Sequence, residues 1–301
     1  MARNKKKKPE RQEWKLPAPL QLLRAGLSGA LSLAKIAVGG IVTVALMLLV
    51  CCIVVVGAAG DYLEQEVIPN TSFNEDVSLD QTSFIYYVDA NGDIQLYEKI
   101  NTSTDRQWAT LDEIPDSLIH AAIAIEDQRF YEHQGVDWIT TVKACANMFF
   151  GGSDTFGGST ITQQLIKNLT GDNSVTVQRK VEEIFRAQKY ERANDKDTIM
   201  EWYLNTVYFG KLKYGVKSAA MYYFGKELNE LTVAESASLI AITNNPSLYN
   251  PYNHPKNNRK RQENVLWAMK EQKWITEDEY RAALEQEMVF TRGNENKQIF
   301  T

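Results

Sequence analysis

The sequence predicts a mainly α-helical domain that follows one membrane-spanning helix and a short β-hairpin. Three observations support this prediction. An uncharged run of 25 residues lies near the N-terminus, an Asn-Gly pair separates two strand-like segments, and later segments repeat apolar residues at i, i+3, i+4 spacing. The composition, with 44% hydrophobic and 24% charged residues, is typical of a globular chain and excludes a disordered or collagen-like one.

The first predicted element is the membrane-spanning helix, at residues 36–60. A helix of roughly 20 apolar residues is long enough to cross the hydrocarbon core. A cleavable signal peptide is the alternative, because the run ends in Ala58-Ala59-Gly60, but its apolar part is normally only about 7 to 15 residues long. Nine Lys or Arg residues lie in the head 1–35, and acidic residues follow the run. The positive-inside rule therefore predicts a single-pass protein of the cytoplasmic membrane, with a cytoplasmic N-terminus and an extracytoplasmic domain.

The extracytoplasmic part is acidic and has one cysteine. Beyond residue 60 the chain carries 24 Lys or Arg and 36 Asp or Glu residues, which argues against nucleic acid as a partner. Cys51 and Cys52 lie in the apolar run, so Cys145 has no partner for an internal disulfide. A packed core must therefore stabilise this domain.

Residues 61–113 are predicted to form a stalk and the hairpin. Two runs rich in β-branched and aromatic residues flank Asn91-Gly92, a pair that favours a type I′ turn. Residues 114–275 form the helical domain, and 276–301 are expected to be a C-terminal tail. The helical spacing covers 117–127, 159–169, 176–192, 196–208, 232–243 and 256–272, and Thr232 and Glu235 have the spacing of a capping box.

The first motif with chemical potential follows the apolar helix and reads Glu126-Asp127-Gln-Arg-Phe130-Tyr131-Glu-His133-Gln-Gly135-Val-Asp137. Two adjacent carboxylates at the end of a buried helix favour a raised pKa on one of them, as a general base or acid near neutral pH requires. A helix C-terminus with solvated acids and a capping histidine is the structural alternative.

The second motif is a glycine-rich helix start, Gly157-Gly158-Ser159-Thr160, followed by Gln163, Gln164 and Lys167. Backbone N–H groups and the helix dipole at such a start suit an anion. Ser159 or Thr160 as a plain N-cap is the alternative.

The third and fourth motifs lie on the next two predicted helices. Arg179, Glu183 and Arg186 are spaced to share one face, which suits either a diphosphate site or a surface salt-bridge ladder. The segment 200–210 is predicted to be a core helix that ends at Gly210, with Glu201 and Asn205 orienting their neighbours.

Together these motifs resemble one family, the peptidoglycan glycosyltransferases, which occur alone or as the N-terminal domain of class A penicillin-binding proteins. The residues that match are E-D-x-x-F-Y-x-H-x-G-x-D at 126–137, G-G-S-T-I-T-Q-Q-L-x-K-N at 157–168, R-K-x-x-E at 179–183 and E-x-Y-L-N-x-x-Y-F-G at 201–210. The resemblance implies a lysozyme-like helical lobe with a small membrane-facing jaw lobe, for which residues 138–152 are the candidate.

The resemblance also implies a reaction that polymerises lipid II, with the growing lipid-linked glycan chain as donor. Glu126 would be the general base, and Glu183 would assist departure of the lipid diphosphate with inversion at the anomeric carbon. A divalent cation, Mg²⁺ or Mn²⁺, would be bound with the diphosphate. The residues implied in substrate binding are Asp127, Phe130, His133, Gly158, Ser159, Thr160, Gln163, Gln164, Lys167, Arg179, Lys180 and Asn205.

The chain departs from the family pattern at two positions, and two other functions compete with this interpretation. Lys143 stands where many relatives have arginine, and Glu182 adds a second acid beside Glu183. No K-T-G or K-S-G triplet is present, so we expect no transpeptidase in these residues. A lytic enzyme would share the fold and the acid but would not need the diphosphate-binding residues. A scaffold with a decayed site would lack a catalytic carboxylate, and both are present. The sequence identifies no protein partners in cell-wall synthesis.

Overall fold

The computed structural model describes residues 18–62, 65, 79–100, 104–143, 158–172, 174 and 176–291. The chain divides into two compact units, residues 1–66 and 67–301, and each is described by itself.

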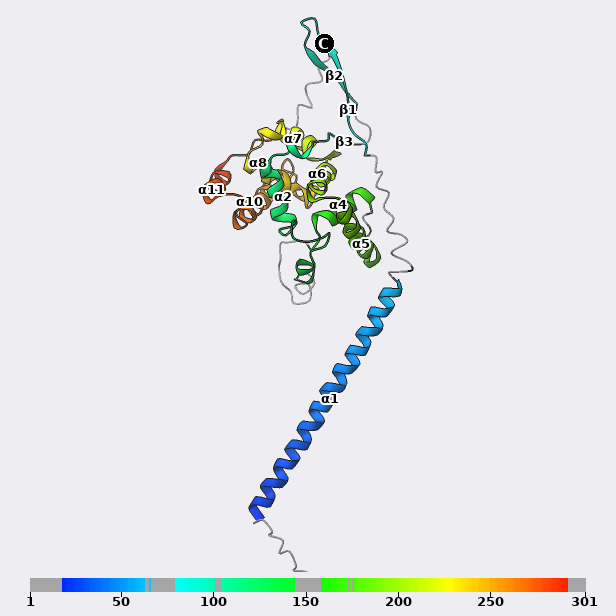
Figure 1. Ribbon diagram of the computed structural model, residues 1–301. Coiled ribbons are helices and arrows are strands. Elements are labelled where there is room, and N and C mark those ends of the chain that lie inside the picture. The colour runs from blue at the N-terminus through cyan, green and yellow to red at the C-terminus, as the bar shows by residue number, and fades with distance from the viewer. Residues whose placement is uncertain are drawn as a thin grey trace, which may run out of the picture. The chain divides into compact units, whose positions relative to one another are not determined.

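The first unit is one long helix, α1 (Ala18–Tyr62) (Figure 1). Its part from Val38 to Tyr62 is 25 residues long with a mean hydropathy of 3.1, so it is long and apolar enough to cross a membrane. The prediction of one spanning helix is confirmed at the level of length and composition. Cys51 and Cys52 lie in this segment as free thiols, and Cys145 lies outside the described residues.

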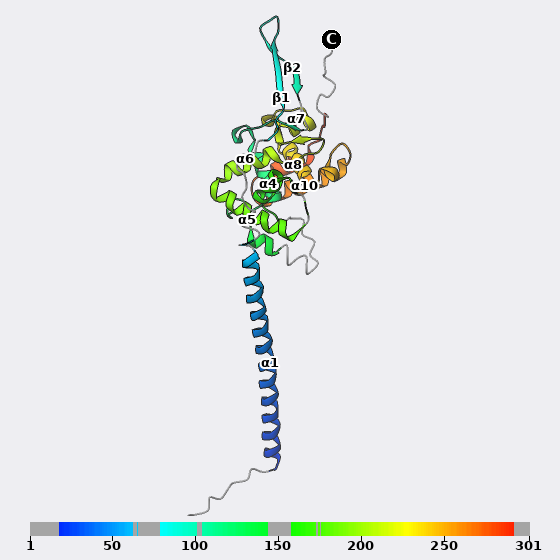
Figure 2. The ribbon, with the colours of Figure 1, turned by 90° about the vertical axis from the view of Figure 1, so that its right-hand side faces the viewer.

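The second unit begins with the predicted hairpin, β1 (Ser83–Val88) paired antiparallel with β2 (Ile94–Ile100), which extends away from the helices (Figure 2). The prediction of a type I′ turn is wrong. Gly92 has φ of +90° but Asn91 does not have a positive φ, and the Gly92 N–H donates to the carbonyl of Asp89. The Asp89 carboxylate also accepts the backbone N–H groups of Asn91 and Asp93, and this favours a wider loop with glycine at its end.

A second small sheet joins the base of the hairpin to the helices. Strand β3 (Asp105–Arg106) runs parallel to β4 (Lys213–Tyr214). The buried carboxylate of Asp105 accepts hydrogen bonds from Lys99 of β2 at 2.8 Å and from Lys213 of β4 at 2.7 Å. These two ion pairs hold the hairpin base against the helical domain.

The rest of the unit is helical, as predicted. Its helices are α2 (Asp116–Glu126), α4 (Ile161–Thr170), α5 (Val177–Ala193), α6 (Lys196–Thr206), α7 (Val216–Phe224), α8 (Val233–Thr243), α9 (Pro246–Tyr249), α10 (Pro255–Glu271) and α11 (Glu277–Glu285), with the 3₁₀ helices η3 (Leu111–Glu113) and η4 (Leu228–Glu230). Helices α2, α8 and α10 pack against one another at the centre, and α4 packs between α5 and α6. Thr232 forms the predicted capping box with Glu235 at the start of α8.

Two boundaries differ from the prediction. Helix α6 ends at Thr206 because Val207 is extended, and Gly210, with φ of +88°, lies in a later turn and does not end the helix. The expected tail 276–301 begins with helix α11, whose Ala283 is buried in the core, and Phe290 packs against the same core. Through Thr291 this segment is therefore part of the domain.

Candidate active site

Glu126 is the last residue of α2, and it is held by neutral hydrogen-bond donors. Six apolar residues of α2 are buried, so the helix is fixed in the core and its C-terminal side chain has a defined position. Gln164 Nε2 donates to Glu126 Oε2 at 2.8 Å, and the Thr243 hydroxyl, which lies 2.8 Å from the carbonyl of Ile240, also lies 3.3 Å from Glu126 Oε1. The carboxylate is half-buried and has no ion-pair partner among the described residues. It therefore has the placement of a base that can accept a proton.

Tyr203 lies close enough to Glu126 for the two side chains to interact electrostatically. Its side chain is fully buried, and burial, together with the negative charge of Glu126, raises the pKa of the Tyr203 phenol well above its ordinary value. The phenol therefore stays neutral beside Glu126.

Asp127 has a different role from its neighbour. It is buried, and its Oδ2 accepts the backbone N–H of Ile161 at 3.0 Å and lies 2.8 Å from Nε2 of His133. The anion at the N-terminus of α4 is thus a side chain of the protein itself. The N–H of Ile161 is therefore already bonded within the protein.

Thr160 and Gln163 complete this helix start. The Thr160 hydroxyl accepts the N–H of Gln163, and Gln163 Oε1 accepts the N–H of Thr160, so the two form a capping box. Both side chains are buried. The structure places them as helix-capping residues.

A buried chain of charges continues from Asp127. Nδ1 of His133 lies 3.9 Å from Glu191, whose carboxylate accepts from Lys196 at 2.6 Å and from the Thr162 hydroxyl at 2.7 Å. The ammonium of Lys196 also donates to the carbonyl of His133. Sequence reasoning missed Glu191 and Lys196, because their charges give no sign of burial when they are read as residues of a helix surface.

The second carboxylate, Glu183, is buried on α5 and clamped by two cations. Arg179 Nη1 and Lys180 Nζ each donate to it at 2.5 Å, one to each oxygen. Lys180 Nζ also donates to Ser159 Oγ at 2.7 Å, so the second and third motifs meet at this point. Arg186 pairs with Glu182 at 3.3 Å, whereas the cations paired with Glu183 are Arg179 and Lys180.

The remaining predicted residues divide by exposure. Lys167 is exposed on α4. Gly158, which lies just before this helix, is half-buried. Phe130 is fully buried under the ammonium of Lys196, whose Nζ lies 4.4 Å from the ring centroid. Asn205 is also fully buried. It bonds to both backbone groups of Ala109, and this confirms its predicted orienting role but directs its amide into the protein.

The jaw candidate is described only in part. Residues 144–152 lie outside the described residues, and 138–143 are helical. Trp138, Ile139 and Val142 are exposed on this helical stretch.

The donor set does not fit a resident metal ion. No cluster of three or more His, Cys, Asp or Glu side chains suited to a metal exists within the described ranges. Both oxygens of Glu183 are already paired with cations, which would repel a further one.

The family assignment rests on comparison with known proteins. Residues 93–270, more than half of the chain, match the transglycosylase family. The chain belongs to this family. The transglycosylase match covers the hairpin strand β2 and all four motifs, and it ends within α10.

Relatives of this transglycosylase are longer proteins. It is 39% identical over 230 residues to penicillin-binding protein 1A of Aquifex aeolicus, covering 76% of this chain and 31% of that one. It is 42% identical over 194 residues to penicillin-binding protein 1F of Bacillus subtilis, covering 64% of this chain and 26% of that one. A crystal structure of penicillin-binding protein 1A from Haemophilus influenzae aligns with 24% identity and a TM-score of 0.41 over 72% of this chain and 22% of that one. The chain thus spans less than a third of the length of each of these relatives.

Proposed function

We propose that this chain is a peptidoglycan glycosyltransferase that polymerises lipid II into glycan strands at the outer face of the cytoplasmic membrane. One observation carries the proposal: the segment 159–164 bonds to both carboxylate centres. Gln164 donates to Glu126, and Ser159 accepts from Lys180, which is paired with Glu183. One short segment therefore contacts both the proposed base, Glu126, and Lys180, one of the cations paired with Glu183. Transfer of a sugar from a diphosphate to a hydroxyl requires a base for the hydroxyl proton and positive charge for the diphosphate.

Glu126 is proposed to act as the general base. It removes the proton of the acceptor's 4-hydroxyl while that oxygen forms a bond to the donor's anomeric carbon. The bond from this carbon to the lipid diphosphate breaks, and the diphosphate leaves with the electron pair. The configuration at the carbon inverts because attack and departure occur on opposite faces.

Glu183 is proposed to assist departure through the cations that it holds. A buried carboxylate whose two oxygens are occupied does not itself stabilise a leaving anion. It fixes Arg179 and Lys180 in place, and their remaining N–H groups neutralise the diphosphate. Lys167 is exposed and supplies a further cation for the same anion.

The buried residues of the predicted binding set are proposed to act indirectly, by positioning other residues of the site. Asp127, His133, Thr160 and Gln163 hold the start of α4, and this positions Gln164 toward Glu126. A divalent ion, Mg²⁺ or Mn²⁺, would arrive bound to the substrate's diphosphate, and we assign it no step because no donor cluster suited to a metal lies among the residues that the structure describes.

The apolar part of α1 is proposed to anchor the enzyme in the membrane with residues 1–35 on the cytoplasmic side. The basic composition of that head supports this orientation. Both substrates are membrane-anchored, so the anchor keeps the enzyme where they are.

The test is polymerisation of fluorescent lipid II by the full chain in detergent with a divalent ion. A ladder of glycan products on a gel, absent with Glu126→Gln, is the expected result. Digestion of preformed glycan without polymerisation would instead indicate a lytic enzyme. Product from neither variant, with a folded chain that still binds lipid II, would indicate a scaffold.

A further inference from the structure

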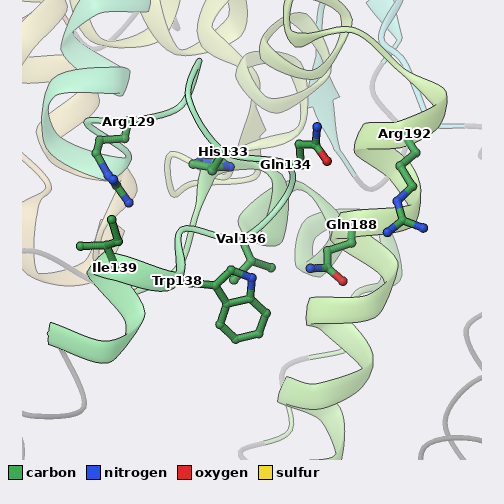
Figure 3. A pocket seen from close by; sticks show the side chains of 8 residues that line it. All are labelled: Arg129, His133, Gln134, Val136, Trp138, Ile139, Gln188 and Arg192. Carbon is green, nitrogen blue, oxygen red and sulfur yellow. The ribbon is translucent and has the colours of Figure 1, made fainter.

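A surface hollow of about 350 Å³ lies beside the helical residues 138–143, between the loop after Glu126 and the C-terminal half of α5 (Figure 3). Neither Glu126 nor Glu183 lines it. The eight side chains around it are Arg129, His133, Gln134, Val136, Trp138, Ile139, Gln188 and Arg192. None of the eight is acidic, two carry guanidinium groups, of which Arg129 is paired with Asp137, and two carry amide groups. Such a lining suits an anion.

The two guanidinium groups of the hollow differ in how they are held. Arg129 is fixed by the buried carboxylate of Asp137, to which its Nε donates at 2.9 Å and its Nη2 also donates. Its third nitrogen, Nη1, has only a distant contact with Glu132, at 3.8 Å. Arg192 is exposed and makes no ion pair or side-chain hydrogen bond with the residues that the structure describes. Arg129 is therefore occupied by Asp137, whereas Arg192 is available to a ligand.

Large apolar side chains stand next to these cations. Trp138, Ile139 and Val142 are 53%, 54% and 64% exposed, and they lie within one and a half turns of the same helical stretch. Trp138 and Ile139 also line the hollow. Exposed aromatic and aliphatic residues beside arginine are typical of protein surfaces that meet the headgroup level of a bilayer.

We propose that this hollow binds the phosphate of an anionic membrane phospholipid, with Arg192 on the phosphate and Trp138 and Ile139 against its glycerol and first acyl carbons. Guanidinium groups recognise phosphate through paired N–H donors, and Gln134 and Gln188 supply further donors. A free phosphate would satisfy Arg192 but would leave the apolar residues in water. The chain also carries a segment able to span a membrane, so the domain is tethered within reach of lipid headgroups.

The site shares His133 with the residues that hold the start of α4, but neither Glu126 nor the Arg179–Glu183 cluster lines it. Gln188 and Arg192 of α5 follow that cluster along the chain. Lipid bound there would fix the surface at Trp138 against the bilayer.

The experiment is native mass spectrometry of the full chain in a neutral detergent, titrated with short-chain phosphatidylglycerol. Parallel titrations use phosphatidylcholine of the same acyl length and inorganic phosphate. The basic residues 1–35 give background binding common to every variant, so the readout is the difference between variants. Arg192→Gln is expected to weaken phosphatidylglycerol binding about tenfold, as loss of one charge-assisted hydrogen bond does.

Two further variants make the result specific. Trp138→Ala is expected to weaken phosphatidylglycerol binding but to leave phosphate binding unchanged. Lys189→Gln removes the same charge from an exposed position of α5 outside the hollow and is expected to change neither. Equal losses in Arg192→Gln and Lys189→Gln would overturn the proposal, since they would show attraction by net charge alone. Equal affinity for phosphatidylcholine, or phosphate binding as tight as that of the lipid, would also overturn it.

Discussion

Glu126 and Glu183 are the two carboxylates of the candidate site, and they are held by opposite kinds of partner. Glu126 accepts hydrogen bonds from a neutral amide and a neutral hydroxyl, at 2.8 Å and 3.3 Å. Glu183 is paired with Arg179 and Lys180, each at 2.5 Å. Glu126 can take up a proton without breaking an ion pair, whereas Glu183 would have to break two.

This difference suits the two glutamates to different roles in the proposed reaction. A carboxylate held by neutral donors is suited to proton transfer, and one that is clamped by cations is suited to organising positive charge for an anion. The contrast predicts that neutralising Glu126 affects turnover more than stability, and that neutralising Glu183 affects both.

The largest expected effect is that of Glu126→Gln on turnover. The substitution keeps size and hydrogen bonding but removes the base, so we expect polymerisation to fall by at least about 100-fold. The free energy of unfolding should change by less than about 1 kcal/mol, because no ion pair is lost. Asp116→Asn, at the exposed start of the same helix, is the matched control. Unchanged polymerisation would remove Glu126 from its proposed role.

Glu183→Gln should lower stability as well as turnover. It leaves Arg179 and Lys180 without their shared partner, and we expect a loss of about 2 kcal/mol in the free energy of unfolding, reduced from the buried-pair value because Lys180 is partly exposed. Urea unfolding measures the loss. Glu182→Gln, one residue away, is the control. Equal effects of the two substitutions would mean that the clamp has no special role.

Lys167→Ala tests the anion-binding side without disturbing the fold. Lys167 is exposed, so we expect stability to stay within about 0.5 kcal/mol. The apparent affinity for lipid II should weaken about tenfold, as loss of one charged contact to a diphosphate does. An unaltered affinity would contradict the diphosphate-binding role of this residue.

Thr243→Val tests how much the neutral partners of Glu126 matter. The substitution keeps shape and removes one hydroxyl donor, so we expect kcat to fall about threefold with KM unchanged. Thr170→Val is the control, because its hydroxyl donates to a helix carbonyl at 2.9 Å but to no carboxylate. A KM effect without a kcat effect would place Thr243 in binding.

The smallest effect concerns pH and Asp137. Burial works to raise its pKa, but hydrogen bonds from Arg129 and Thr140 outweigh burial and lower it below the ordinary value of 3.8. The folded state therefore favours the ionised form, and this contribution is complete above pH 3.8 and is lost as pH falls further. We expect Asp137→Asn to flatten the acid side of the stability curve measured by urea unfolding. An unchanged slope would show that other carboxylates dominate it.

Much of the local structure could be predicted because its causes lie within a few residues. Apolar spacing predicted α2, α4, α5, α6, α8 and α10, and the Thr232–Glu235 pair predicted the start of α8. The hairpin was also predicted, but its turn was not, because the side chain of Asp89 accepts backbone N–H groups and favours a wider loop.

The sequence by itself determined which segments are helices, which run can span a membrane and which carboxylates and cations belong to the motifs. Only the tertiary structure decided what each polar group bonds to. Asp127 meets the N–H of Ile161 across 34 residues, and Glu126 meets Thr243 across 117. These pairings arise from helix packing rather than from chain spacing. For that reason Asp127 accepts a backbone N–H at the start of α4, and the buried Asn205 bonds to the backbone of Ala109, although the motifs placed both among candidate substrate ligands.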